Sequence, residues 1–273
     1  CHLQVLVDNR DTVTALAEDR DTDMGTWIKV DTGYGRTGTP WNQVNAIADL
    51  AREIETAHGL SLAGLLTHSG HSYHASTPAE IVRIFNETRE RMISVKATLA
   101  ERGIAVPAVS IGDTPGCTLE DNFSGMDEIR PGNFVFYDLM QLDLQVCRPD
   151  DLALALACPV VGIYPDRGEA VILGGAVHFS KDRIRRNRRD IFGVGIRITP
   201  DGFGELLESV TLNGMSQEHG IVRMPGELLS RLQIGDVLSF IPAHSCLTAD
   251  LYGHYRTPSD ERIDRINSVT LRS

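Results

Sequence analysis

Hydrophobic positions in the first half of the chain alternate between two patterns. Short apolar runs are typical of buried strands, and longer stretches that repeat apolar residues at helical spacing are typical of amphipathic helices. The predicted helices are 12–20, 42–57 and 77–102. The predicted strands are 3–7, 26–30, 62–66 and 108–111, with a candidate fifth at 128–129 and a last one at 134–137. This alternation predicts a parallel α/β sheet, open or closed into a barrel.

The second half of the chain has a different pattern. Its apolar runs are short, are separated by Gly, Pro and Asp turns, and give way to helical periodicity only near 227–232. The runs lie at 160–164, 170–173, 191–198, 209–212 and 237–241. They predict a mostly antiparallel β domain. We therefore divide the chain into an α/β domain over 1–145 and a β domain over 146–273.

Composition narrows the functional classes. The 273 residues, 42% of them hydrophobic, suffice for one large or two medium cores. A net charge of −11 argues against nucleic acid or an anionic membrane as a partner. The Arg-rich run 183–189 is expected to be a solvated loop or an interface patch. The five cysteines are widely spaced, which predicts free thiols in a reducing compartment. No window holds the apolar residues, about 18, that a membrane span needs. Together these observations predict a cytoplasmic protein.

Polar, glycine-rich segments follow the predicted strands. Asp31–Gly38 contains glycines that permit close backbone approach and Arg36, whose guanidinium can hold an anion. Three histidines in 67–74 favour a polar pocket wall over a metal cage. Segments 112–116 and 130–133 are candidate phosphate-binding turns. Because the carboxyl ends of parallel strands meet at one edge, these segments predict an anion site there.

A histidine and a cysteine close the last apolar run. In an extended chain alternate side chains share a face, so His244 and Cys246 are predicted to point the same way. Zinc accepts these N and S donors, which makes the pair a candidate half-site. The alternative is a half-buried histidine beside a structural cysteine.

The ordered set of motifs resembles the fold-type III pyridoxal-phosphate enzymes. Within them it is most similar to the D-serine dehydratase and D-threonine aldolase branch, which is related to alanine racemase. The resemblance implies a partial TIM-type α/β barrel followed by a mostly antiparallel β domain, in a homodimer. The motifs that carry it are Asp31-Thr32-Gly33-Tyr34-Gly35-Arg36-Thr37-Gly38, His68-Ser69-Gly70-His71-Ser72-Tyr73, Gly112-Asp113-Thr114-Pro115, Arg130-Pro131-Gly132-Asn133, Glu218-His219-Gly220 and Pro242-Ala243-His244-Ser245-Cys246.

Cofactors and site residues follow from the resemblance. It implies pyridoxal 5'-phosphate (PLP) and a divalent metal, zinc first, with His244 and Cys246 as the metal ligands. It implies two catalytic residues, Arg36 beside the cofactor and the substrate carboxylate, and Tyr73 at the pyridine ring. The implied cofactor-binding residues are His68, Tyr73, Gly112, Asp113, Thr114, Gly132 and Asn133.

In one respect the sequence departs from the family. The family's Schiff-base lysine lies on the first barrel strand, which we do not find here. The lysines present are Lys29, Lys96 and Lys181, and Lys29 is expected to line the pocket or to be structural. The chain also starts at Cys1, directly before a predicted buried strand. We therefore expect two barrel strands upstream, in a longer enzyme of which this chain is a fragment.

The resemblance implies a lyase that acts on a D-amino acid. A thiolate at Cys246, where the aldolases tend to present an oxygen ligand, favours β-elimination of a D-3-hydroxy amino acid to a 2-oxo acid and ammonia. One alternative is aldolase-like cleavage to glycine and an aldehyde, and another is an amino-acid racemase. A non-catalytic PLP-binding protein is the alternative from a different class.

Overall fold

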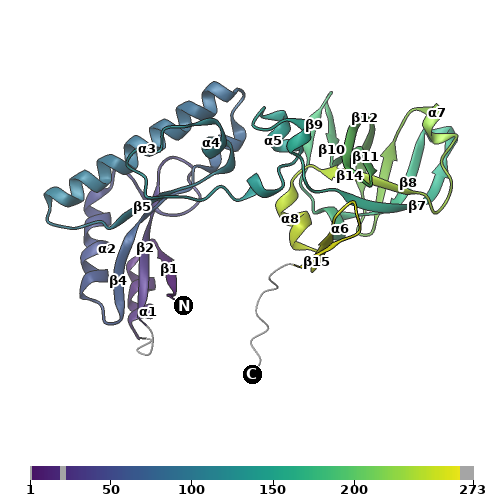
Figure 1. Cartoon of the computed structure of the whole chain (residues 1–273). Coiled ribbons are helices and arrows are strands. Elements are labelled where there is room, and N and C mark those ends of the chain that lie inside the picture. Colours follow the sequence, from purple (N-terminus) through teal and green to yellow (C-terminus); the bar gives the residue numbers. More distant parts are fainter. Residues whose placement is uncertain (1, 19–22, 265–273) are drawn as a thin grey trace. The chain divides into compact units, whose positions relative to one another are not determined.

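The computed structural model describes residues 2–18 and 23–264 (Figure 1). The chain divides into two compact units, Cys1–Phe134 and Val135–Ser273, and each has its own core. The predicted boundary between domains lay at 145/146, whereas the two compact units meet at 134/135. Among the described residues, no helix combines the length and the apolar character that crossing a membrane requires.

The first unit is built on a parallel sheet. Its strands run in the order β1-β2-β4-β5-β6, and β3 pairs in parallel with β2 off this path. All pairings in this sheet are parallel, as the strand and helix alternation predicts. The strands are β1 (Gln4–Val7), β2 (Met24–Asp31), β3 (Thr39–Pro40), β4 (Leu60–Leu66), β5 (Ala108–Ile111) and β6 (Glu128–Ile129).

Helices α1 to α3 pack with this sheet. The core joins side chains of β2, β4 and β5 to the apolar faces of α2 and α3, and Ile47, Leu65 and Leu99 in it are fully buried. Thr77 caps α3, where its hydroxyl accepts a hydrogen bond from the Glu80 N–H (3.2 Å), and the Glu80 carboxylate accepts from the Ser76 N–H (2.8 Å). The helices are α1 (Arg10–Glu18), α2 (Val44–Thr56), α3 (Pro78–Glu101) and α4 (Thr114–Leu119), with the 3₁₀ turns η1 (Gly70–His74) and η2 (Asn133–Val135).

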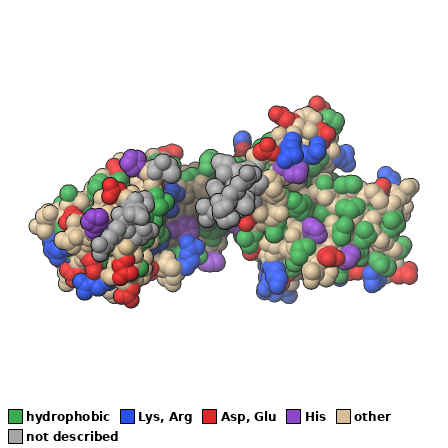
Figure 2. Space-filling model, turned by 90° about the horizontal axis from the view of Figure 1, so that it is seen from below, with side chains coloured by type: hydrophobic (Ala, Val, Ile, Leu, Met, Phe, Trp, Pro, Cys, Tyr) green, Lys and Arg blue, Asp and Glu red, His purple; other side chains and the backbone are tan. Residues whose placement is uncertain are grey.

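The second unit is a closed antiparallel barrel with strand order β11-β12-β13-β8-β7-β14. Phe179 and Phe240 meet edge to face in its core, with ring centroids 6.2 Å apart. On its outer surface, apolar side chains are scattered among polar ones (Figure 2). The barrel strands are β7 (Leu156–Tyr164), β8 (Glu169–Leu173), β11 (Gly193–Thr199), β12 (Gly202–Met215), β13 (His219–Arg223) and β14 (Val237–Pro242).

Short elements decorate the barrel. Two hairpins lie beside it, β9 (Ile184–Arg186) with β10 (Arg189–Ile191) and β15 (His254–Arg256) with β16 (Arg262–Asp264). The helices are α5 (Leu139–Asp143), α6 (Ala176–Phe179), α7 (Gly226–Leu229) and α8 (Ser245–Asp250), with the 3₁₀ turns η3 (Pro149–Asp151) and η4 (Pro165–Arg167).

The Arg-rich run is therefore a hairpin rather than a loop. Its tight turn places Asn187 and Arg188 at φ of 50° and 63°. Arg186 forms ion pairs with Asp143 (2.6 Å) and Glu208 (2.7 Å), which attaches the hairpin to α5 and β12. The run thus has a structural role within the unit.

The predicted architecture is confirmed, a parallel sheet followed by an antiparallel β domain, but one predicted strand is wrong. Residues 134–137 lie in η2 and the segment after it, where Tyr137 has φ of 48°, a left-handed conformation that a strand does not accommodate. The predicted run 191–198 spans the end of β10 and most of β11. The elements α4, β9, β13, β15 and β16 were not predicted. The predicted end of the first helix near Arg20 lies outside the described residues.

Lys29 is a buried cation on β2, with a side chain that is only 6% exposed. Burial, together with the nearby charges of Arg130 and Arg36, lowers its pKa from the ordinary 10.5 to about 8. The unfolded chain therefore binds more protons than the folded chain between pH 8 and 10.5, so stability rises with pH across this window.

We predict that Lys29→Met stabilises the first unit at pH 7 by up to about 3 kcal/mol, because it removes a charge that folding desolvates. Urea unfolding at pH 7 and pH 10 measures the effect, and the gain should shrink at the higher pH. Lys181→Met, at an exposed position, is the matched control. A loss of stability at pH 7 in the Lys29 variant would contradict the assignment of Lys29 as a strained cation.

Gly64 permits the close approach of β4 to β5. A Cβ at this position would lie 2.2 Å from the Ala108 carbonyl oxygen and 2.6 Å from the Trp27 ring. We therefore predict that Gly64→Ala destabilises the first unit by about 2–3 kcal/mol. Chemical denaturation measures the change, with Gly226→Ala as the control, because a Cβ there meets nothing within 4 Å. Equal stabilities of the two variants would show that the sheet relaxes around the added methyl.

Candidate active site

Three loops meet at one edge of the parallel sheet. Strands β2, β4 and β5 end at Asp31, Leu66 and Ile111, and each is followed by one of the polar segments of the sequence. Neighbouring parallel strands place these ends side by side, which is where α/β folds gather their functional loops.

The buried carboxylate of Asp113 holds two of these loops together. It is 1% exposed and accepts hydrogen bonds from the hydroxyls of Ser69 (2.6 Å) and Ser72 (2.7 Å). It also caps α4 by accepting from the Gly116 N–H (2.6 Å). In the same contact region His68 Nδ1 lies 2.6 Å from the Gly112 carbonyl oxygen. These contacts bring the predicted residues His68, Gly112 and Asp113 into one cluster.

Tyr34 connects the loop after β2 to the loop that carries His68. The Asp31 carboxylate shapes this loop by accepting from the N–H groups of Gly33 (2.9 Å) and Gly35 (3.1 Å). The Tyr34 ring meets the His68 ring edge to face, with centroids 5.6 Å apart, and the Arg36 guanidinium lies 5.1 Å from the Tyr34 centroid. Arg36 is thereby placed with the His68 loop.

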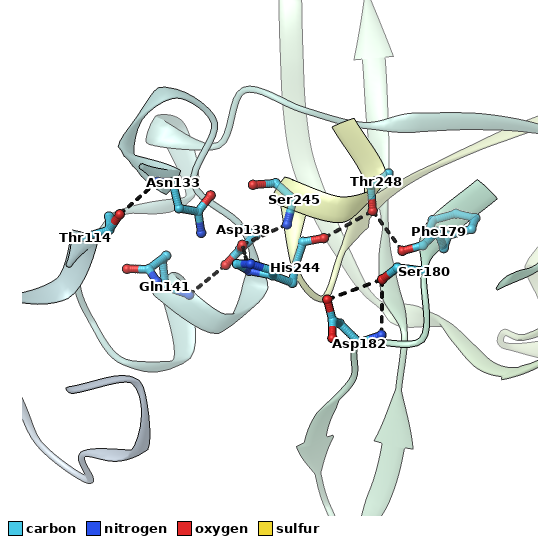
Figure 3. Close-up of polar contacts among 10 residues, drawn as sticks. All are labelled: Thr114, Asn133, Asp138, Gln141, Phe179, Ser180, Asp182, His244, Ser245 and Thr248. Carbon is cyan, nitrogen blue, oxygen red and sulfur yellow. Dashed lines mark hydrogen bonds and ion pairs between the residues drawn. The ribbon is translucent and has the colours of Figure 1, made fainter. Parts of the chain in front are cut away.

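Thr114 and Asn133 connect the fourth predicted segment to this cluster. The Asn133 N–H donates to the Thr114 hydroxyl (2.9 Å), and both residues are buried (Figure 3). The backbone N–H groups of Thr114 and Gly132 donate no hydrogen bond within the described part of the chain. Two free donors beside a hydroxyl fit a phosphate group.

The charges around the cluster also fit an anion. Arg36 and Arg130 lie close enough to Lys29 to lower its pKa. Arg130 is itself held between strands, donating to the Thr67 carbonyl and to the Ser110 hydroxyl (2.7 Å). Because Arg36 and Arg130 repel the Lys29 ammonium, a bound phosphate or carboxylate would relieve this repulsion.

Two histidines of the second loop, His68 and His71, are partly buried. Burial lowers the pKa values of His68 and His71, so neutral rings are favoured. Within residues 2–18 and 23–264, no cluster of three or more His, Cys, Asp or Glu could hold a metal. The preference for a polar pocket wall over a metal cage stays a prediction. Tyr73 lies half-buried on η1 in the same loop.

His244 and Cys246 lie close together, although for a different reason than predicted. Strand β14 ends at Pro242 and α8 begins at Ser245, so the expected alternation along one extended strand is wrong. His244 is the N-cap of α8, and the Cys246 thiol in the first turn lies close enough to its ring to raise the pKa of His244.

A buried carboxylate holds the other side of the His244 ring. Asp138 Oδ2 lies 2.8 Å from His244 Nδ1 and also accepts from the Ser245 N–H (2.9 Å), as Figure 3 shows. Burial lowers the pKa of His244, but the hydrogen bond with Asp138 and the nearby Cys246 thiol outweigh it and raise the pKa to about 10.

The donor atoms of His244 and Cys246 fit zinc in an open site. An imidazole nitrogen and a thiolate sulfur are donors that zinc prefers, and a carboxylate behind a ligating histidine is the usual supporting group. Two protein donors leave coordination positions for water or substrate, as catalytic sites require. Sequence reasoning missed Asp138, which stands 106 residues before His244 and in no motif with it.

Family models match both parts of the chain. Residues 1–139 match the model described as "Alanine racemase, N-terminal domain", and residues 153–257 match the "Putative serine dehydratase domain". The first match alone covers more than half of the 273 residues.

Several curated relatives are named as dehydratases, and one as an aldolase. The chain is 29% identical over 264 residues to the D-threo-3-hydroxyaspartate dehydratase of Delftia sp. (strain HT23), covering 94% of this chain and 69% of the relative. It is 31% identical over 247 residues to the D-serine dehydratase of Dictyostelium discoideum, covering 86% and 61%. The chain thus spans about two thirds of the length of these relatives.

Solved structures share the fold. The Delftia enzyme superposes with a TM-score of 0.88 at 26% identity, covering 98% of this chain and 73% of that chain. Its solved variants include a cysteine-to-alanine variant in a metal-free form and a histidine-to-alanine variant two positions apart from it. D-threonine aldolase from Filomicrobium marinum shares the fold with a TM-score of 0.79 at 18% identity, covering 97% and 69%.

The predicted fold class is thus confirmed by these neighbours, and the predicted enzyme class, a PLP-dependent lyase, is confirmed at the level of the family. With its first part matched by the alanine racemase N-terminal model and its second by the serine dehydratase model, the chain belongs to the alanine racemase-like family of pyridoxal-phosphate enzymes, in the branch of the D-serine dehydratases.

Proposed function

We propose that the protein is a PLP- and zinc-dependent lyase that converts a D-3-hydroxy amino acid into a 2-oxo acid and ammonia. The observation that carries the proposal is the pair His244 and Cys246, backed by buried Asp138, in the part of the chain that matches the serine dehydratase model. The same spacing of a histidine and a cysteine in the Delftia variants, one of them metal-free, supports this pair as metal ligands.

The first unit would hold the cofactor and the substrate carboxylate. The unpaired N–H groups of Thr114 and Gly132 would donate to the cofactor phosphate, with the Thr114 hydroxyl beside them. Asp113 would act through the loops that it holds, because its carboxylate is already engaged by three donors. Exposed Arg36 would bind the substrate carboxylate, while Tyr73 and neutral His68 would line the cofactor ring.

His244 and Cys246 would hold the metal in the second unit. Bound zinc supplies Lewis acidity toward a β-hydroxyl, and bound PLP supplies an electron sink for the loss of the Cα proton. Asp138 would keep the imidazole fixed while the substrate exchanges at the open positions of the site. The overall reaction breaks the Cα–H and Cβ–O bonds and releases ammonia, and the water lost in elimination is regained when the imine is hydrolysed.

The remaining expectations are also proposals. We propose a homodimer, from the family resemblance, and a cytoplasmic location. The thiols of Cys117, Cys147, Cys158 and Cys246 are all free, which suits a reducing compartment.

Product analysis tests the proposed reaction. The protein should be loaded with PLP and zinc and incubated separately with D-serine, D-threonine and D-threo-3-hydroxyaspartate. We expect a 2-oxo acid and ammonia in equal amounts. Glycine with an aldehyde would instead assign an aldolase, inverted substrate without either product a racemase, and PLP binding without turnover a binding protein.

We predict that His244→Ala and Cys246→Ala each reduce bound zinc and lower 2-oxo acid production by roughly a hundredfold or more, since each removes one of two protein donors. Metal analysis of the purified variants and a coupled assay measure both effects. His254→Ala, an exposed histidine in the same unit, should leave both unchanged. Full activity in a metal-depleted Cys246 variant would refute the role of zinc.

A further inference from the structure

Asp138 accepts hydrogen bonds at both of its carboxylate oxygens. Oδ1 accepts from the Gln141 N–H (3.0 Å) and so caps α5. Oδ2 accepts from the Ser245 N–H (2.9 Å) and faces His244 Nδ1 (2.8 Å) (Figure 3). The residue is fully buried, whereas the His244 side chain is 21% exposed. One oxygen of the carboxylate thus caps a helix, and the other contacts the His244 ring.

The contact with Asp138 fixes the tautomer of the His244 ring as well as its position. A carboxylate only accepts hydrogen bonds, so the nitrogen that faces it must carry the proton. When a metal displaces the proton from Nε2, Nδ1–H stays against Asp138 and Nε2 offers its lone pair, which is the form that binds a metal. The Cys246 thiol lies close to the same ring.

We propose that Asp138 is a positioning residue for metal binding, which holds His244 in the orientation and tautomer that present Nε2, beside the Cys246 sulfur, to a divalent metal. The inference rests on the metal site of the proposed function and extends it to a residue outside the donor pair. Asp138 would not touch the metal itself.

Asp138→Asn separates the two tasks of the side chain. Its amide oxygen can keep the α5 cap, since asparagine is a good N-cap residue. Its NH₂ group would then replace Oδ2 and face two donors, the Ser245 N–H and His244 Nδ1–H. The ring can relieve this clash only by moving its proton to Nε2, which blocks the metal-binding nitrogen.

The test measures metal affinity rather than turnover. Metal-free wild type and Asp138→Asn are titrated with Zn²⁺ and with Co²⁺ against a chromophoric chelator, and the cobalt–thiolate absorption reports Cys246. We expect the variant to bind about 10- to 100-fold more weakly. Asp143→Asn is the matched control, because it removes a carboxylate on the same helix that pairs with Arg186 and should leave affinity within about twofold.

Each outcome has a separate meaning. If wild type binds neither metal, the proposed metal site fails and takes this inference with it. If wild type binds and folded Asp138→Asn binds equally well, the metal site stands and the positioning role is refuted. A lower melting temperature of the metal-free variant with unchanged metal affinity would assign Asp138 to capping alone.

A second measurement needs no variant and decides the case if Asp138→Asn does not fold. In the cobalt-loaded wild type, a histidine bound through Nε2 keeps its Nδ1–H, which gives a hyperfine-shifted NMR signal. We expect this signal to exchange slowly with solvent, because the proton is held by a buried carboxylate. An absent or rapidly exchanging signal would overturn the proposal.

Discussion

The first unit depends on a buried negative charge. Asp113 is almost fully excluded from solvent, and a carboxylate in that position is tolerated only if donors replace the lost water. Two serine hydroxyls from one loop and a backbone N–H from the next helix supply them. Because the donors come from two different strand ends, satisfying the charge also fixes the spacing of the loops, and the candidate cofactor site inherits its geometry from this requirement.

The second unit uses the same device. Asp138 is also a buried N-cap of a short helix, and it also receives donors from a segment far along the chain. In both cases the helix is too short to be stable alone, so the cap matters more for joining segments than for helix formation. Two aspartates thus organise the two donor sets, the one proposed for an anion and the one proposed for a metal.

The sequence was informative where structure is set by local rules. Hydrophobic spacing located the strands of the sheet and the long helix α3, because this signal acts within a few residues. It failed at 134–137, where Tyr137 adopts a positive φ in spite of an apolar pattern. It also could not find Asp138, since no local pattern links a carboxylate to a ring 106 residues later. The extended geometry assumed for His244 and Cys246 was wrong, and their proximity comes instead from the first turn of α8.

The separation of Asp138 from His244 has a consequence for folding order. All six barrel strands lie between α5 and α8 in the chain, so the two residues meet only after this long segment has closed on itself. Closing such a long loop costs conformational entropy before the contact between the two residues can stabilise the fold. The pair therefore belongs to the last events of barrel assembly, and a metal ion bound through it would report a completed barrel rather than help to nucleate one.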